Sequence, residues 1–133
     1  MDELERIREK KIEELTKRFK GDKMETEIEV NDNSFEKEII ERSNQTPVVV
    51  DFWAPWCMPC RMLSPALERF AGEYKGKFIL AKVNVDEARA AAQRYGIMSI
   101  PCVKMFKNGK VFDEFIGAIP ENQVKEWLDK NLD

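Results

Sequence analysis

Residues 48–61 read VVVDFWAPWCMPCR, an apolar run broken by one aspartate and followed by two cysteines that are three positions apart. If a helix begins near Cys57, this spacing places the sulfurs of Cys57 and Cys60 on one face of its first turn, close enough to form a disulfide. Unpaired N–H groups at a helix start carry partial positive charge and stabilise a thiolate over a thiol. The pattern is therefore typical of a redox-active dithiol.

The composition limits the size of the protein and the classes of its partners. The chain has 133 residues, of which 43% are hydrophobic, enough for one domain with a sizeable core plus a tail. The net charge of −3 gives no broad basic field, so we expect no nucleic acid and no membrane surface as the main partner. No apolar run reaches transmembrane length.

Cysteine and histidine usage narrows the chemistry. Three cysteines do not make a disulfide framework, and no histidine is present, which excludes zinc sites with histidine ligands, Cys–His proteases and acid–base catalysis by histidine. In a reducing compartment a Cys-x-x-Cys near a βαβ pattern indicates catalysis. The alternative is a metal or iron–sulfur site, completed by Cys102 as a third ligand or by a second copy of the chain.

The first 23 residues differ from the remainder. They predict an amphipathic N-terminal helical extension, and its apolar stripe consists of Leu4, Ile7, Ile12, Leu15 and Phe19. The alternatives for this helix are packing on its own domain, self-association and docking to a partner. Because the first twenty residues are highly charged and lack a secretory h-region, we expect a cytoplasmic location. Gly21 and Asp22 end the helix, and residues 24–133 form the second predicted unit.

Alternating helical and strand patterns fill residues 24–133. They predict strands over 25–30, 48–53, 77–85, 103–106 and 111–115, the last two joined by a hairpin at Asn108-Gly109. They predict helices after a capping box at 33–36, after the dithiol with a kink at Pro65, over 87–95, and near the C-terminus. This order implies an α/β fold with a mixed central sheet and helices on both faces.

These residues resemble thioredoxin across residues 24–133. The motifs that carry the resemblance are VDFWAPWCMPCR at 50–61, Pro65, Lys82, YGI at 95–97, Ile100-Pro101, FKNG at 106–109 and Gly117. The resemblance implies a thioredoxin fold and protein-disulfide reduction by dithiol–disulfide exchange, serving general redox homeostasis and electron transport. It implies no bound cofactor beyond the Cys57–Cys60 disulfide, disulfide-containing proteins as substrates, and a thioredoxin reductase as electron donor.

The resemblance also assigns roles to individual residues. Cys57 would lie exposed at the helix start as the nucleophile, and Cys60 would lie behind it as the resolving thiol. Asp51 would transfer the proton of Cys60, because burial raises the pKa of its carboxyl, and Lys82 would moderate that shift. Pro101 matches a position held in cis. The implied substrate-binding groove consists of Trp56, Met58, Pro59, Ile100, Pro101, Gly117 and Ala118.

The chain departs from the family pattern at three places. Met58 replaces the more common glycine, and the dipeptide between the cysteines holds no histidine, which favours a reductant over an oxidant. Cys102 stands where a hydroxyl residue is common, either as a small buried residue or as a regulatory or competing thiol. The third departure is the N-terminal helix. The alternatives on the same fold are a glutaredoxin-like or isomerase role, and from another class a metal-bearing interaction module.

Overall fold

The computed structural model describes residues 25–132, and the predicted extension over residues 1–23 lies outside them. The described elements follow one another as β1 (Glu27–Glu29), the π-helical segment η1 (Glu36–Glu41), the 3-10 segment η2 (Arg42–Asn44), β2 (Val48–Trp53), α2 (Met58–Glu73), β3 (Ile79–Asn84), α3 (Arg89–Arg94), β4 (Cys102–Lys107), β5 (Lys110–Ile116) and α4 (Glu121–Asn131). No helix among the described residues is both long and apolar enough to cross a membrane.

The five strands form one mixed sheet in the order β1-β3-β2-β4-β5. Strand β2 pairs parallel with β3 and antiparallel with β4, so it lies in the middle. The β4–β5 hairpin turns at Asn108 and Gly109, whose φ values of 53° and 79° are those that a tight two-residue turn requires. The predicted α/β fold is thus confirmed, with the parallel pairs first in the chain and the antiparallel hairpin last.

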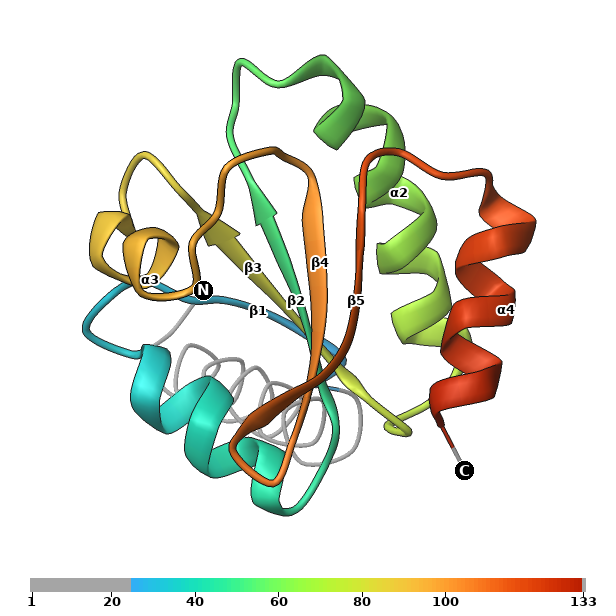
Figure 1. Cartoon of the computed structure of the whole chain (residues 1–133). Coiled ribbons are helices and arrows are strands. Elements are labelled where there is room, and N and C mark those ends of the chain that lie inside the picture. Colours follow the sequence, from blue (N-terminus) through green and yellow to red (C-terminus); the bar gives the residue numbers. More distant parts are fainter. Residues whose placement is uncertain (1–24, 133) are drawn as a thin grey trace, which may run out of the picture.

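Helices cover both faces of the sheet (Figure 1): α2 and α4 on one side, and η1 and α3 on the other. Side chains on β2 alternate between two buried clusters. Val48, Val50 and Phe52 pack with η1, whereas Val49 packs with α2 and α4. Because successive strand residues point to opposite faces, Asp51 shares the face of Val49 and is directed toward α2. This register explains why an acidic side chain lies beneath the helix that carries the dithiol.

The first helical segment corrects one prediction. The predicted box over residues 33–36 does not form, and Phe35, the N-cap of η1, has no side-chain cap. A reciprocal pair of hydrogen bonds joins Asn31 and Ser34 in the turn before η1. The Asn31 N–H donates to Ser34 Oγ over 3.1 Å, and the Ser34 N–H donates to Asn31 Oδ1 over 3.0 Å. The carboxylate of Glu36 instead pairs with Arg94 at 3.3 Å. The predicted box had the right spacing, but its acidic member is held by a residue distant in sequence.

Candidate active site

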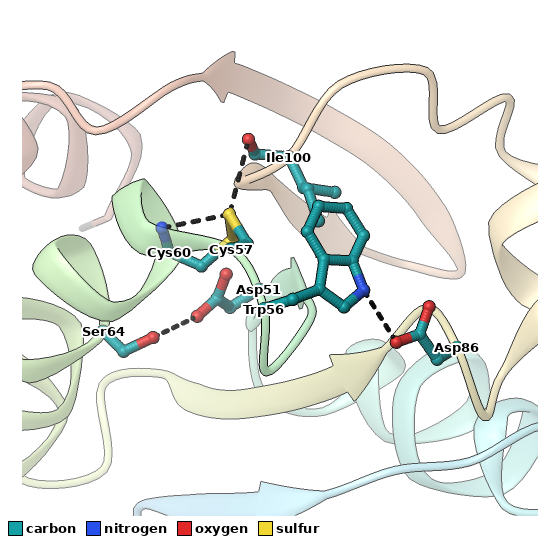
Figure 2. The surroundings of a disulfide bond; sticks show 7 residues. All are labelled: Asp51, Trp56, Cys57, Cys60, Ser64, Asp86 and Ile100. Carbon is teal, nitrogen blue, oxygen red and sulfur yellow. Dashed lines mark hydrogen bonds between the residues drawn. A yellow bond between two sulfur atoms is a disulfide. The ribbon is translucent and has the colours of Figure 1, made fainter.

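The dithiol lies where β2 passes into α2. Cys57 is the N-cap of α2, and its Sγ accepts a hydrogen bond from the Cys60 N–H over 3.2 Å. Pro59 falls in the first turn, where a missing N–H costs no helical hydrogen bond. A disulfide joins Cys57 to Cys60, and Figure 2 shows it at the start of the helix. Helix N-terminal N–H groups at this position stabilise negative charge on Cys57 once the disulfide is reduced.

Cys57 is more buried than expected, whereas Cys60 is buried as expected. Cys57 is 4% exposed and Cys60 is 0% exposed, so the expectation of an exposed Cys57 is wrong in degree. The cause is long-range packing, because the carbonyl oxygen of Ile100 lies 3.8 Å from Cys57 Sγ and the pair packs with Ala54 and Trp53. Of the two residues, Cys57 alone presents surface to solvent. A substrate sulfur can therefore reach the disulfide only through a small opening beside Cys57.

Asp51 lies buried in the central strand, facing α2. Its side chain has no exposed surface; Oδ2 accepts a hydrogen bond from Ser64 Oγ over 3.1 Å, and Oδ1 has no partner among the described residues. Burial raises the pKa of Asp51 from 3.8 to about 6, against smaller lowering effects of the Ser64 hydrogen bond and the Lys82 charge. The carboxyl group therefore changes protonation state near the pH at which thiols exchange.

Lys82 lies opposite Asp51 in the register between β2 and β3. Its ammonium group donates to Glu68 Oε1 on α2 over 2.8 Å, and it lies 5.1 Å from the centre of the Trp53 ring. The charge of Lys82 lowers the pKa of Asp51, while the charge of Glu68 raises it. Because Glu68 holds the ammonium group, Lys82 acts on Asp51 through the field of an ion pair and reduces the effect of burial only in part.

The residues predicted for the groove differ in accessibility. Trp56 and Met58 are 70% and 63% exposed, and the Trp56 indole N–H donates to Asp86 Oδ2 over 2.9 Å (Figure 2). The Ile100–Pro101 peptide bond is cis, and the Pro101 carbonyl accepts a hydrogen bond from the Gly117 N–H over 2.8 Å. Of the other residues predicted for the groove, Pro59 and Ala118 are exposed, and Ile100 and Gly117 are half-buried.

Two exposed methionines and one buried serine at the site were not predicted from the sequence. Met62 and Met98 are 71% and 94% exposed, and Met62 lies one helical turn after Met58, which adds to the apolar surface of α2. Ser64 was also missed. Its signal was available, because it follows Cys60 by four residues and so falls on the same, otherwise apolar, face of the helix.

Cys102, the first residue of β4, is 3% exposed and packs in the cluster beneath η1. Burial raises the pKa of its thiol, which disfavours the reactive thiolate. Over residues 25–132 no group of three or more cysteine, aspartate or glutamate side chains is arranged to hold a metal ion. The structure thus presents Cys102 as a core residue of the sheet.

A disulfide at the start of a helix, above a buried carboxyl group and beside a cis-proline, defines a thiol–disulfide oxidoreductase. The family model described as Thioredoxin matches residues 26–130. The chain belongs to the thioredoxin family. Its activity is protein-disulfide reduction by dithiol–disulfide exchange. Members of this family use their own redox-active disulfide, act on disulfide-containing proteins and receive electrons from a reductase.

Curated relatives from bacteria and from a chloroplast resemble the chain over most of its length. Thioredoxin 2 of Chlorobaculum tepidum is 46% identical over 79% of this chain and 94% of its own. Thioredoxin 1 of Nostoc sp. is 42% identical over 82% of this chain and 100% of its own. A chloroplastic M-type thioredoxin of Chlamydomonas reinhardtii is 46% identical over 77% of this chain and 72% of its own. The likeness therefore covers more than three quarters of this chain.

Proposed function

We propose that Cys57 attacks the substrate disulfide and that Cys60 resolves the resulting mixed disulfide. The observation that carries this assignment is the difference in access, since Cys57 has the exposed surface and Cys60 has none. The Cys57 thiolate forms a bond to one substrate sulfur and expels the other as a thiolate. The Cys60 thiolate then attacks Cys57 Sγ, which forms the Cys57–Cys60 disulfide and releases the second substrate sulfur. Two electrons pass from the protein to the substrate.

Asp51 is the proton acceptor for Cys60 in this proposal. A buried thiol is a poor nucleophile until it loses its proton, and Asp51 is the acid on the strand that faces α2. A pKa of about 6 leaves most of the carboxyl ionised at neutral pH, so it can accept a proton when Cys60 attacks. Lys82 has the smaller role of holding this pKa below the value that burial alone would give.

Asp51→Asn is expected to slow the resolving step by about 100-fold, the usual contribution of a positioned general base. In the unchanged protein the rate of that step should rise with pH through an inflection near 6 and level off above it, because only ionised Asp51 accepts the proton. The variant should lack this inflection. Stopped-flow fluorescence with a disulfide substrate at saturating concentration measures the step.

The internal control for this prediction is the first exchange step, measured as mixed-disulfide formation by Cys60→Ser with and without the Asp51→Asn change. It should stay within about twofold, because the attack by Cys57 does not need the Asp51 carboxylate. An unchanged resolving rate and an unchanged pH profile in Asp51→Asn would reject Asp51 as the proton acceptor.

The substrate surface in this proposal surrounds the opening at Cys57. Trp56, Met58 and Pro59 offer exposed apolar area on one side, and Ile100 offers a backbone carbonyl on the other. An extended peptide that carries a disulfide could pair with this backbone and bury its apolar side chains on the exposed ones. Pro101, Gly117 and Ala118 shape the far wall through the hydrogen bond between Gly117 and Pro101.

The proposed physiological role is that of an electron carrier in the cytoplasm, recharged by a flavin-dependent, NADPH-fed thioredoxin reductase. The low number of cysteines and the buried free thiol of Cys102 fit a reducing compartment. No bound cofactor is needed, because the reacting electrons reside in the Cys57–Cys60 pair. The absence of a histidine between the cysteines leaves the thiolate without an imidazolium partner, which favours the reductant.

The reduction potential tests the proposed direction of electron flow. We expect a reduction potential of about −270 mV for the Cys57–Cys60 couple, at the reducing end of this class and far from the oxidising end at about −120 mV. Equilibration with a graded dithiothreitol buffer and thiol counting by alkylation measures it, with Cys102→Ser as the control for the buried thiol. A value near the oxidising end would replace the reductase with an oxidase or isomerase role.

A further inference from the structure

Ser64 on α2 contacts the carboxyl group of Asp51. It follows Cys60 by one helical turn on the buried face of α2 and is 8% exposed. Its hydroxyl donates to Asp51 Oδ2 over 3.1 Å, a hydrogen bond between the helix that carries the dithiol and the central strand β2. Figure 2 shows this contact on the side of the carboxyl group away from the disulfide. The same helix face thus presents first Cys60 and then Ser64 to one carboxyl group.

The contact makes the two oxygens of Asp51 unequal. Oδ2 is held by Ser64, whereas Oδ1 is buried and has no hydrogen-bond partner among residues 25–132. A buried carboxylate oxygen without a partner is costly, and it persists only where the surroundings fix the group. Holding Oδ2 limits rotation of the carboxyl group and leaves Oδ1 as the free acceptor.

Other charged and titratable groups near Asp51 act at longer range. On β3, the ammonium group of Lys82 donates a hydrogen bond to Glu68 of α2 over 2.8 Å. On β4, the charge of Asp51 contributes to the raised pKa of the buried Cys102 thiol. Neither Lys82 nor Glu68 makes the contact to the Asp51 carboxyl that Ser64 makes. The direct hydrogen bond from Ser64 is therefore the contact that can fix the orientation of the carboxyl group.

We propose that Ser64 is a positioning residue for the proton transfer from Cys60: its hydroxyl holds one oxygen of the Asp51 carboxylate and so keeps the other available to the Cys60 thiol. This inference rests on the proposed role of Asp51. A hydroxyl donates more strongly to a carboxylate than to a neutral acid, so Ser64 also keeps the pKa of Asp51 lower than burial alone would make it. One side chain thus sets both the direction and the basicity of the acceptor.

Ser64→Ala removes the hydroxyl and leaves the helix intact, since alanine is the best helix former. We expect the titration midpoint of Asp51, followed by NMR of its carboxyl carbon in the oxidised protein, to rise by about one pH unit. The inflection in the rate of the resolving step should move upward by about the same amount, with a loss of about fivefold in rate at pH 6. Ser64→Thr keeps a hydroxyl and should restore both.

Ser43→Ala is the matched control for the loss of a buried hydroxyl. Ser43 is 4% exposed, and its Oγ donates to the Ile40 carbonyl and accepts from the Gly109 N–H, in a region apart from the dithiol. This variant should lose stability but keep both the Asp51 titration midpoint and the pH profile of the resolving step.

Two results would overturn the inference while leaving Asp51 as the acceptor. The first is an unmoved Asp51 midpoint in Ser64→Ala. The second is a moved midpoint with an unmoved rate profile, in a protein whose Asp51→Asn variant does lose the inflection. If Asp51→Asn itself keeps the full profile, the proposed role of Asp51 fails, and the positioning role fails with it.

Discussion

Cys57→Ser is expected to abolish turnover of a protein-disulfide substrate, and Cys60→Ser to stop the reaction after one covalent step. Serine cannot form the thiolate that attacks a disulfide, so the first variant should show no activity above the uncatalysed rate, a loss of at least about 1000-fold. The second variant keeps Cys57 at the start of α2, where the helix N–H groups stabilise its thiolate. It should accumulate a stable mixed disulfide with the substrate.

Insulin reduction, followed by turbidity, measures turnover, and non-reducing electrophoresis with mass spectrometry detects the mixed disulfide. Cys102→Ser is the matched control, because it also removes one thiol, but one that is buried in the sheet. It should retain activity and accumulate no mixed disulfide, because Cys60 still resolves the intermediate. If Cys57→Ser forms the adduct and Cys60→Ser does not, the assignment of attacking and resolving thiols is reversed.

The second large effect that we expect is a pH dependence of protein stability, which arises from the burial of Asp51. The pKa of Asp51 is about 6 in the folded protein, against an ordinary value of 3.8. As the pH rises from about 4 to about 6, Asp51 therefore loses its proton in the unfolded chain but still keeps it in the folded protein. The unfolded state then binds fewer protons than the native state, and stability falls as the pH rises. The contribution is fully present below about pH 4, is lost progressively up to about pH 6, and amounts to roughly 3 kcal/mol.

Asp51→Asn removes this titration. The difference in unfolding free energy between variant and unchanged protein should therefore shift by roughly 2.5 kcal/mol in favour of the variant between about pH 4 and pH 7.5. Comparing the two pH values cancels any cost of burying the amide, because that cost does not depend on pH. Urea unfolding of both oxidised proteins measures the difference.

Asp113→Asn provides a control of opposite sign. Burial raises the pKa of Asp113, but its hydrogen bonds with Asn131 and with the Glu114 N–H, together with the nearby Lys130 charge, outweigh it and lower the pKa overall. Its ionised form therefore stabilises the protein above the ordinary pKa, and this stabilisation is lost as the pH falls. Asp113→Asn should lower stability near neutral pH.

The contradicting outcome concerns Asp51. If the difference in unfolding free energy between Asp51→Asn and the unchanged protein does not change with pH, the pKa of Asp51 is not raised in the folded protein.

Much of the fold was predictable because each strand and helix of the domain carries its own periodicity. The apolar run of β2 indicated a central strand, and Asn108-Gly109 indicated the hairpin. The same alternation that buries Val49 against α2 sets the direction of Asp51. In the sequence analysis, the place of this acid behind Cys60 was implied by the resemblance and not by the strand pattern. The prediction was reliable where local pattern and tertiary packing agree.

Contacts could not be predicted from the sequence where a side chain binds a distant partner in place of a local one. The carboxylate of Asp32 accepts hydrogen bonds from the N–H groups of Ala90 and Ala91 over 3.1 and 2.9 Å. Glu36 likewise pairs with Arg94, and so the expected capping box does not form. Residues nearly sixty positions apart determine these contacts, and no local pattern contains that information. Ser64 was missed although its spacing from Cys60 placed it on the buried face of α2. Its partner, Asp51, is set by the register of β2 beneath α2.

The small exposed area of Cys57 has a consequence for which disulfides the protein can reduce. Because Cys57 is only 4% exposed, its sulfur cannot reach a disulfide inside a folded core. The substrate bond must instead come out to it, on a protruding segment or through local opening of the substrate. For disulfides within stable domains, the rate of reduction should then track how often the substrate opens. In such cases the protein would act as a sensor of local unfolding in its substrates.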